Sequence, residues 1–174
     1  AEHGEDSQVM LVSDNQMIID SSLKVLESQL KDLPRKSIAE KALKNSRSIL
    51  FTSMDECIEF SNEYTPEHLI IAAENATVLS EKVINAGSVF LGNYSCESAG
   101  DYASGTNHTL PTNGYAKNFS GVSLESFQKM ITFQELSKTG LKEIGEAIEI
   151  MAEAEDLFAH KNAVTIRLKK LKDD

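Results

Sequence analysis

Leu69-Ile70-Ile71-Ala72 and Ser88-Val89-Phe90-Leu91 are two short apolar runs that decide the fold of this chain. The stretch 76–85 between them has the pattern of a helix and is closed by Ala86-Gly87. Glycine is favoured just beyond a helix C-terminus, so the helix is expected to end there. A strand, a helix and a second strand in this order are typical of parallel βα units.

The same alternation extends upstream of this stretch. We expect strands at 9–12 and 48–52, and helices at 17–33, 35–45 and 53–61, the last with Ser53 as its N-cap. The fold class predicted is therefore α/β: an incomplete Rossmann-like parallel βα domain. Ligands of such sheets are expected near the carboxyl ends of the strands.

The pattern changes after Gly92. Residues 93–114 are rich in Gly, Ser, Thr and Asn without periodicity, and loops of this length in compact domains tend to be functional. A strand-like piece at 129–133 precedes a tail that is helical at 141–158 and 160–171. We expect an α/β domain over 1–122 that carries the active-site loops.

The remaining residues, 123–174, are expected to form an extended helical C-terminal tail. Its helices contain too few apolar residues to build a core alone. They must therefore pack on another part of the protein or on another chain.

Composition excludes several classes of function. The 174 residues carry 17 Lys+Arg against 27 Asp+Glu, a net charge of −10, which argues against nucleic acid or an anionic membrane as main partner. No apolar run approaches the roughly 20 residues of a transmembrane helix. The start of the chain is acidic and has no export signal, so we expect a cytoplasmic protein. Because it lacks an initiator Met, we also expect a piece of a longer protein.

Glu67 and His68 lie directly before the strand at 69–72, after Pro66. A carboxylate and an imidazole held side by side at a rigid junction can act as two proton-transfer groups of different basicity. The alternative is a turn whose polar side chains only cap the strand.

Asp101 and His108 lie in the glycine-containing loop, where small side chains let the backbone approach a ligand closely. They could supply metal ligands or substrate hydrogen bonds; the alternative is a mobile surface loop. Glu155 and His160 lie near the break between the tail helices, and His3 lies at the N-terminus. Two imidazoles and a carboxylate, from His3, Asp101 and His160, would suit a zinc with open positions. Their spacing carries no metal signature.

Three blocks of sequence resemble the histidinol dehydrogenase family. They are Tyr64-Thr65-Pro66-Glu67-His68-Leu69, the string Glu97-Ser98-Ala99-Gly100-Asp101-Tyr102-Ala103-Ser104-Gly105-Thr106-Asn107-His108-Thr109-Leu110-Pro111-Thr112, and Ala159-His160-Lys161-Asn162-Ala163-Val164. The first nine residues resemble a further block, so the resemblance runs in order from the first residue to the tail.

The resemblance implies an enzyme of histidine biosynthesis that oxidises L-histidinol to L-histidine through the aldehyde, with two NAD⁺ and a bound Zn²⁺. It implies that Glu67 and His68 are the acid–base residues: His68 relays protons from the alcohol, and Glu67 activates water for the second oxidation. It implies zinc ligation by His3, Asp101 and His160. The substrate-binding residues would be His3, His68, Asp101, His108, Glu155 and His160.

The chain also departs from the family pattern. The family's enzymes are more than twice as long, and its remaining protein zinc ligand is a glutamine directly before the position of Ala1. No glycine-rich dinucleotide fingerprint occurs, so most NAD⁺ contacts are expected outside these residues. The resemblance implies a homodimer in which Glu155 and His160 serve the neighbouring site.

We therefore expect the 174 residues alone to be inactive or nearly so. Two other hypotheses remain. The chain could be a non-catalytic βα binding or assembly domain, or a stand-alone zinc hydrolase with Glu67 as its base.

Overall fold

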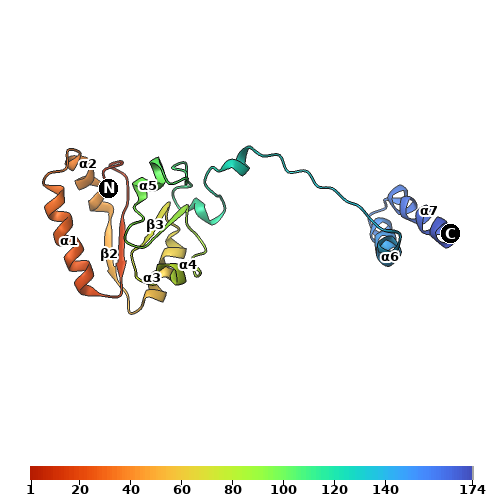
Figure 1. Cartoon of the computed structure of the whole chain (residues 1–174), viewed down its shortest axis with the longest axis horizontal. Coiled ribbons are helices and arrows are strands. Elements are labelled where there is room, and N and C mark those ends of the chain that lie inside the picture. The colour runs from red at the N-terminus through yellow and green to blue at the C-terminus, as the bar shows by residue number, and fades with distance from the viewer. Residues whose placement is uncertain (174) are drawn as a thin grey trace. The chain divides into compact units, whose positions relative to one another are not determined.

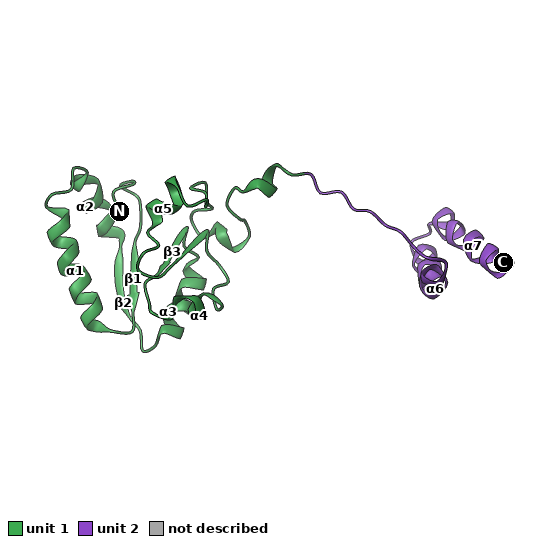
Figure 2. Cartoon of the chain, viewed as in Figure 1, with its two compact units in different colours: residues 1–128 green, residues 129–174 purple. Residues whose placement is uncertain are grey.

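The computed structural model describes residues 1–173, which fall into two compact units, 1–128 and 129–173 (Figures 1 and 2). The first unit is an α/β domain, as predicted. Its elements are β1 (Met10–Ser13), α1 (Gln16–Leu30), α2 (Lys36–Asn45), β2 (Arg47–Leu50), α3 (Met54–Tyr64), β3 (His68–Ile71), α4 (Ala76–Ser80), β4 (Ser88–Leu91), α5 (Glu97–Tyr102) and the 3₁₀ turns η1 (Tyr115–Lys117) and η2 (Leu124–Phe127).

The described strands pair in parallel as two separate two-stranded sheets, β1 with β2 and β3 with β4. Helix α1 packs on the first pair, and α4 packs on the second (Figure 1). Parallel neighbours joined by a helical crossover are the connection that the alternating pattern predicts.

Helix α3 begins and ends through specific local contacts. The Ser53 hydroxyl accepts a hydrogen bond from the backbone N–H of Glu56 at 3.3 Å, so Ser53 is the N-cap that the sequence predicts. At the other end, buried Thr65 adopts a left-handed conformation with φ of 58°. Its hydroxyl donates to the Asn62 carbonyl at 2.9 Å, which helps to hold a conformation that a β-branched residue rarely adopts.

The two faces of the β3–β4 pair carry different side chains. The register pairs His68 with Ser88 and Ile70 with Phe90. Since side chains alternate along a strand, His68 and Phe90 lie on one face, and Leu69, Ile71, Val89 and Leu91 lie on the other. The second face packs into the core cluster with residues of α3 and α4, among them Ile58, Ala76 and Leu79.

Asn62 ties the connection before β4 to helix α3. Its side-chain carbonyl accepts hydrogen bonds from the backbone N–H groups of Ile84 at 2.8 Å and Asn85 at 3.3 Å. Its amide donates to the Lys82 carbonyl at 2.9 Å. One side chain therefore fixes the path of a segment that has no regular structure of its own.

Several details differ from the sequence predictions, and three of them change an element. Residues 97–102 form α5 within the expected loop, α4 ends at Ser80 rather than near 85, and residues 129–133 form no strand. The apolar side chains of Met130 and Phe133 are more than nine-tenths exposed, so the strand-like pattern at 129–133 has no partner among the described residues.

The second unit is a pair of helices, α6 (Lys138–Ala154) and α7 (Phe158–Asp173). They pack closely at Gly145, where an added Cβ would lie 2.7 Å from Leu168 Cδ1. Several large apolar side chains remain exposed on them: Ile144, Ile150, Met151, Leu157, Phe158 and Ile166. The boundary between the units follows η2, whereas the sequence prediction puts it at 122/123.

No described helix is both long and apolar enough to cross a membrane.

We predict that Asn62→Ala destabilises the first unit by about 1–3 kcal/mol, because two backbone N–H groups and a carbonyl lose their partner. Urea unfolding followed by circular dichroism measures this change. Asn93→Ala, which changes an exposed asparagine after β4, is the matched control and should leave the midpoint unchanged. Equal midpoints for both variants would contradict the role given to Asn62.

Candidate acid–base and metal site

His68 opens β3 at a junction that the neighbouring chain holds tightly. The backbone N–H of Gly87 donates to the Pro66 carbonyl at 3.0 Å, and that of Ser88 donates to the Glu67 carbonyl at 2.9 Å. A Cβ at Gly87 would lie 2.5 Å from the Glu67 carbonyl oxygen, so this approach requires glycine. The sequence Glu67-His68 is thus placed by backbone contacts on both sides.

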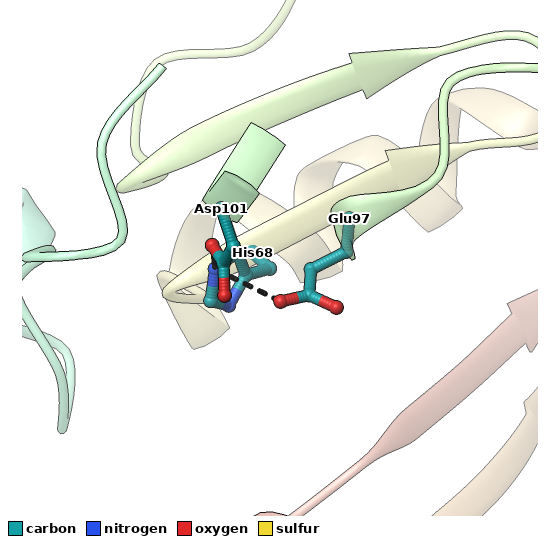
Figure 3. A group of neighbouring side chains, drawn as sticks. All are labelled: His68, Glu97 and Asp101. Carbon is teal, nitrogen blue, oxygen red and sulfur yellow. Dashed lines mark ion pairs between the residues drawn. The ribbon is translucent and has the colours of Figure 1, made fainter. Parts of the chain in front are cut away.

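Helix α5 brings two carboxylates to His68 (Figure 3). Glu97 and Asp101 are four residues apart, which places both on one face of the helix. The His68 Nε2 atom lies 3.9 Å from Glu97 Oε1 and 3.8 Å from Asp101 Oδ1. The three residues can each offer one ligand atom within 4.8 Å of the others, and all are half-buried.

The His68 Nε2 atom is itself buried and has no hydrogen-bond partner among the described residues. Its distances to the carboxylates fall within ion-pair range but exceed a hydrogen bond. A buried polar nitrogen is costly unless something pairs with it. The arrangement therefore suits a cation or a polar ligand group that contacts the imidazole and both carboxylates.

Burial raises the pKa of Glu97, and Asp101 raises it further through a hydrogen bond and through like charge. The imidazoles of His68 and His3 act in the opposite direction on the same pKa. His3, although exposed, therefore lies close enough to Glu97 to act on it electrostatically. Two neighbouring carboxylates that repel each other favour a cation or a shared proton.

The structure gathers some of the predicted site residues and not others. Asp101 and His68 lie together. Glu67 directly precedes His68 in the sequence and is half-buried. His3 lies within electrostatic reach of Glu97. His108 is exposed in the segment that follows α5. Glu155 caps α6 and His160 lies in α7, both exposed and both in the second unit. Their part in the site stays a prediction.

Glu97 is the member of the cluster that the sequence analysis leaves without a role. The only sequence signal for Glu97 is its spacing of four residues from Asp101, which puts the two carboxylates on one face if the segment is helical. Residues 93–114 show no helical period, so the sequence does not predict that helix. Phe90 is a second such residue. The centroid of its ring lies 5.9 Å from that of the His68 ring, whereas the sequence pattern predicts only that it is part of a strand.

The cluster lies at the start of β3, not at the carboxyl ends of the strands where ligands are expected. The chain leaves β4 at Leu91 and turns at Gly92, which has a positive φ of 82°. Helix α5 then packs over the face of the β3–β4 pair that carries His68 and Phe90, and it brings Asp101 to the first residue of β3.

Comparisons with known proteins identify the family of this chain. The family model described as "Histidinol dehydrogenase" matches residues 1–168. Histidinol dehydrogenase from Bacteroides thetaiotaomicron is 59% identical over 172 residues, covering 99% of this chain and 40% of that protein. The enzyme from Haemophilus influenzae is 52% identical over 171 residues, covering 98% of this chain and 40% of that protein.

A solved structure agrees with the sequence relatives. The crystal structure of histidinol dehydrogenase from Elizabethkingia anophelis matches with a TM-score of 0.90 and 62% identity, over 99% of this chain and 40% of that one. This chain thus spans about 40% of the length of the proteins it matches. By sequence and by fold, the chain belongs to the histidinol dehydrogenase family.

Proposed function

We propose that this chain supplies the acid–base residues and part of the metal site of a histidinol dehydrogenase. The parent enzyme would oxidise L-histidinol to L-histidine through the aldehyde and reduce two NAD⁺. The observation that carries the proposal is the buried Nε2 atom of His68, which has no hydrogen-bond partner among residues 1–173 and lies within ion-pair distance of Asp101 and Glu97, in a chain of this family. We further propose a cytoplasmic location, where NAD⁺ is available to a biosynthetic enzyme.

Glu67 and His68, neighbours in the sequence, would divide the proton transfers. His68 takes the hydroxyl proton as the alcohol becomes the aldehyde, because the free nitrogen of a neutral imidazole can accept a proton. Glu67 takes a proton from the water that adds to the aldehyde. Two carbon-bound hydrogens would leave as hydride, one to each NAD⁺, and the carboxylic acid so formed would release a third proton to solvent and leave the carboxylate.

A metal would be held by Asp101 together with His3 and His160, a carboxylate and two imidazoles, which are ligand types that Zn²⁺ accepts. The mutual repulsion of Asp101 and Glu97 supports a cation at this position. When bound, Zn²⁺ would orient and polarise the substrate oxygen or nitrogen that it contacts.

The other roles concern the ends of the substrate and the cofactor. His3, His68, Asp101 and His160 would surround the reacting end, and His108 and Glu155 would complete the binding site. The Glu155 carboxylate suits a cationic amino or imidazolium group. Most of the NAD⁺ site would lie in the part of the relatives that this chain does not span.

We propose that the tail, residues 123–174, joins two copies into a homodimer and brings Glu155 and His160 to the partner's site. The exposed apolar side chains of α6 and α7 support this, because a helix pair this small cannot bury them by itself. Ile150 and Met151, next to each other on α6, are 60% and 66% exposed.

We predict that Glu67→Gln in the full-length protein lowers the rate of histidine formation by about 100-fold or more, since the water loses its base. NADH is measured by absorbance and aldehyde by trapping. The variant should form about one NADH per histidinol in a single turnover instead of two.

The control for this variant is Glu74→Gln, the same change at an exposed position after β3. It should retain wild-type turnover. Unchanged turnover in Glu67→Gln would favour a non-catalytic βα module instead.

For the dimer, we predict that Ile150→Glu combined with Met151→Glu weakens self-association at least tenfold, because charge is placed on an apolar contact. Light scattering of the full-length protein over a concentration series measures it. Lys142→Glu, at an exposed polar position of the same helix, should leave the dimer intact. A monomeric wild-type protein would contradict the proposal.

A further inference from the structure

Gly100 of helix α5 lies against the ring of Phe90 on strand β4. It is buried, and a Cβ added to it would lie 2.5 Å from Cε1 and 2.9 Å from Cζ of Phe90. Contacts this short do not occur at real Cβ atoms, so one of the two elements would have to move. The same Cβ would lie 2.6 Å from Thr106 Oγ1, but Thr106 is exposed, so its side chain has solvent beside it.

The backbone gives no other reason for glycine at this position. Among the described glycines, positive φ values occur at Gly92, Gly105 and Gly114, and Gly100 is helical. Inside a helix alanine is preferred over glycine by about 1 kcal/mol. The absence of a side chain at residue 100 therefore serves the packing against Phe90 and opposes the local helix preference.

Phe90 contacts His68 as well. The two ring centroids lie 5.9 Å apart with an interplanar angle of 30°. The Phe90 side chain is only 7% exposed, so it has little room to retreat. Close-packed interiors transmit a displacement of this kind instead of absorbing it. One buried ring thus lies against both the His68 imidazole and the Gly100 backbone.

The residues on α5 that face His68 are direct neighbours of this contact. Asp101 follows Gly100 in the chain, and Glu97 lies three residues before it. The thickness of the Phe90 ring, together with the bare backbone at Gly100, thereby sets how close the two carboxylates come to His68 Nε2.

We propose that Phe90 and Gly100 are positioning residues that fix the separation between His68 and the carboxylates of α5. Neither residue has a group that takes part in the proposed reaction. As a statement about catalysis the proposal rests on the proposed function, but as a statement about geometry it does not.

Four variants of the full-length protein test it: Gly100→Ala, Phe90→Leu, the two combined, and Ser98→Ala as control. Leucine lacks the Cε1 and Cζ atoms that the new Cβ would meet. Ser98 lies on the exposed side of the same short helix. The readouts are kcat, KM and the affinity for Zn²⁺ by chelator competition.

Gly100→Ala should lower kcat about 100-fold, as a displacement near 1 Å at a catalytic group can. Phe90→Leu should cost less, about two- to tenfold. The combined variant should recover most of the loss and come within about threefold of Phe90→Leu. Ser98→Ala should match the wild type. Zn²⁺ affinity should follow the same order as kcat.

Crystal structures of the full-length wild type and of Gly100→Ala test the geometry without catalysis. Asp101 Oδ1 should lie farther from His68 Nε2 in the variant than in the wild type. An unchanged separation would overturn the proposal, as would a combined variant no more active than Gly100→Ala. If Gly100→Ala does not fold, wild-type kcat in Phe90→Leu would overturn it. A wild type that fails to oxidise histidinol would refute the proposed function and leave the crystallographic result decisive for the positioning.

Discussion

The site depends on one steric constraint: helix α5 can lie against strand β4 only where it presents no side chain. The bare backbone of Gly100 meets the Phe90 ring, and the same ring lies against His68. The start of β3 and helix α5, which follows β4, are thereby brought together. His68 Nε2 lies less than 4 Å from one carboxylate oxygen of Glu97 and one of Asp101. The chemistry available at the site follows from that separation.

The alternation of side chains along β3 and β4 makes this arrangement compatible with a stable domain. Leu69, Ile71, Val89 and Leu91 pack with α3 and α4, and they provide the apolar burial that holds the strands. The opposite face is left for His68 and Phe90 and is covered by α5. The apolar core and the candidate site therefore lie on opposite faces of the same two strands, and a register shift of one residue would exchange the two faces.

How far the sequence predicts the fold differs from element to element. The run at 88–91 is a strand with the predicted bounds, and Ser53 is the predicted N-cap, because both signals are local. Helix α5 was missed, since it has only six residues and is held by packing on Phe90 more than by periodicity. Residues 129–133 form no strand despite their strand-like composition, because a strand also needs a neighbouring strand to pair with.

The candidate site was predictable only in its residue types. The pairing of Glu67 with His68 and the presence of Asp101 could be read along the chain, but Glu97 enters the site only when 97–102 are helical. The exposed apolar positions of α6 and α7 agree with the expectation that the tail cannot form a core alone.

The most direct measurement is a crystal structure of the full-length protein with Zn²⁺ and L-histidinol bound. Our account predicts that the bound molecules contact His68 Nε2 and the Asp101 carboxylate together, with α5 still packed on Phe90. Binding of histidinol and metal at a position away from α5 would contradict it.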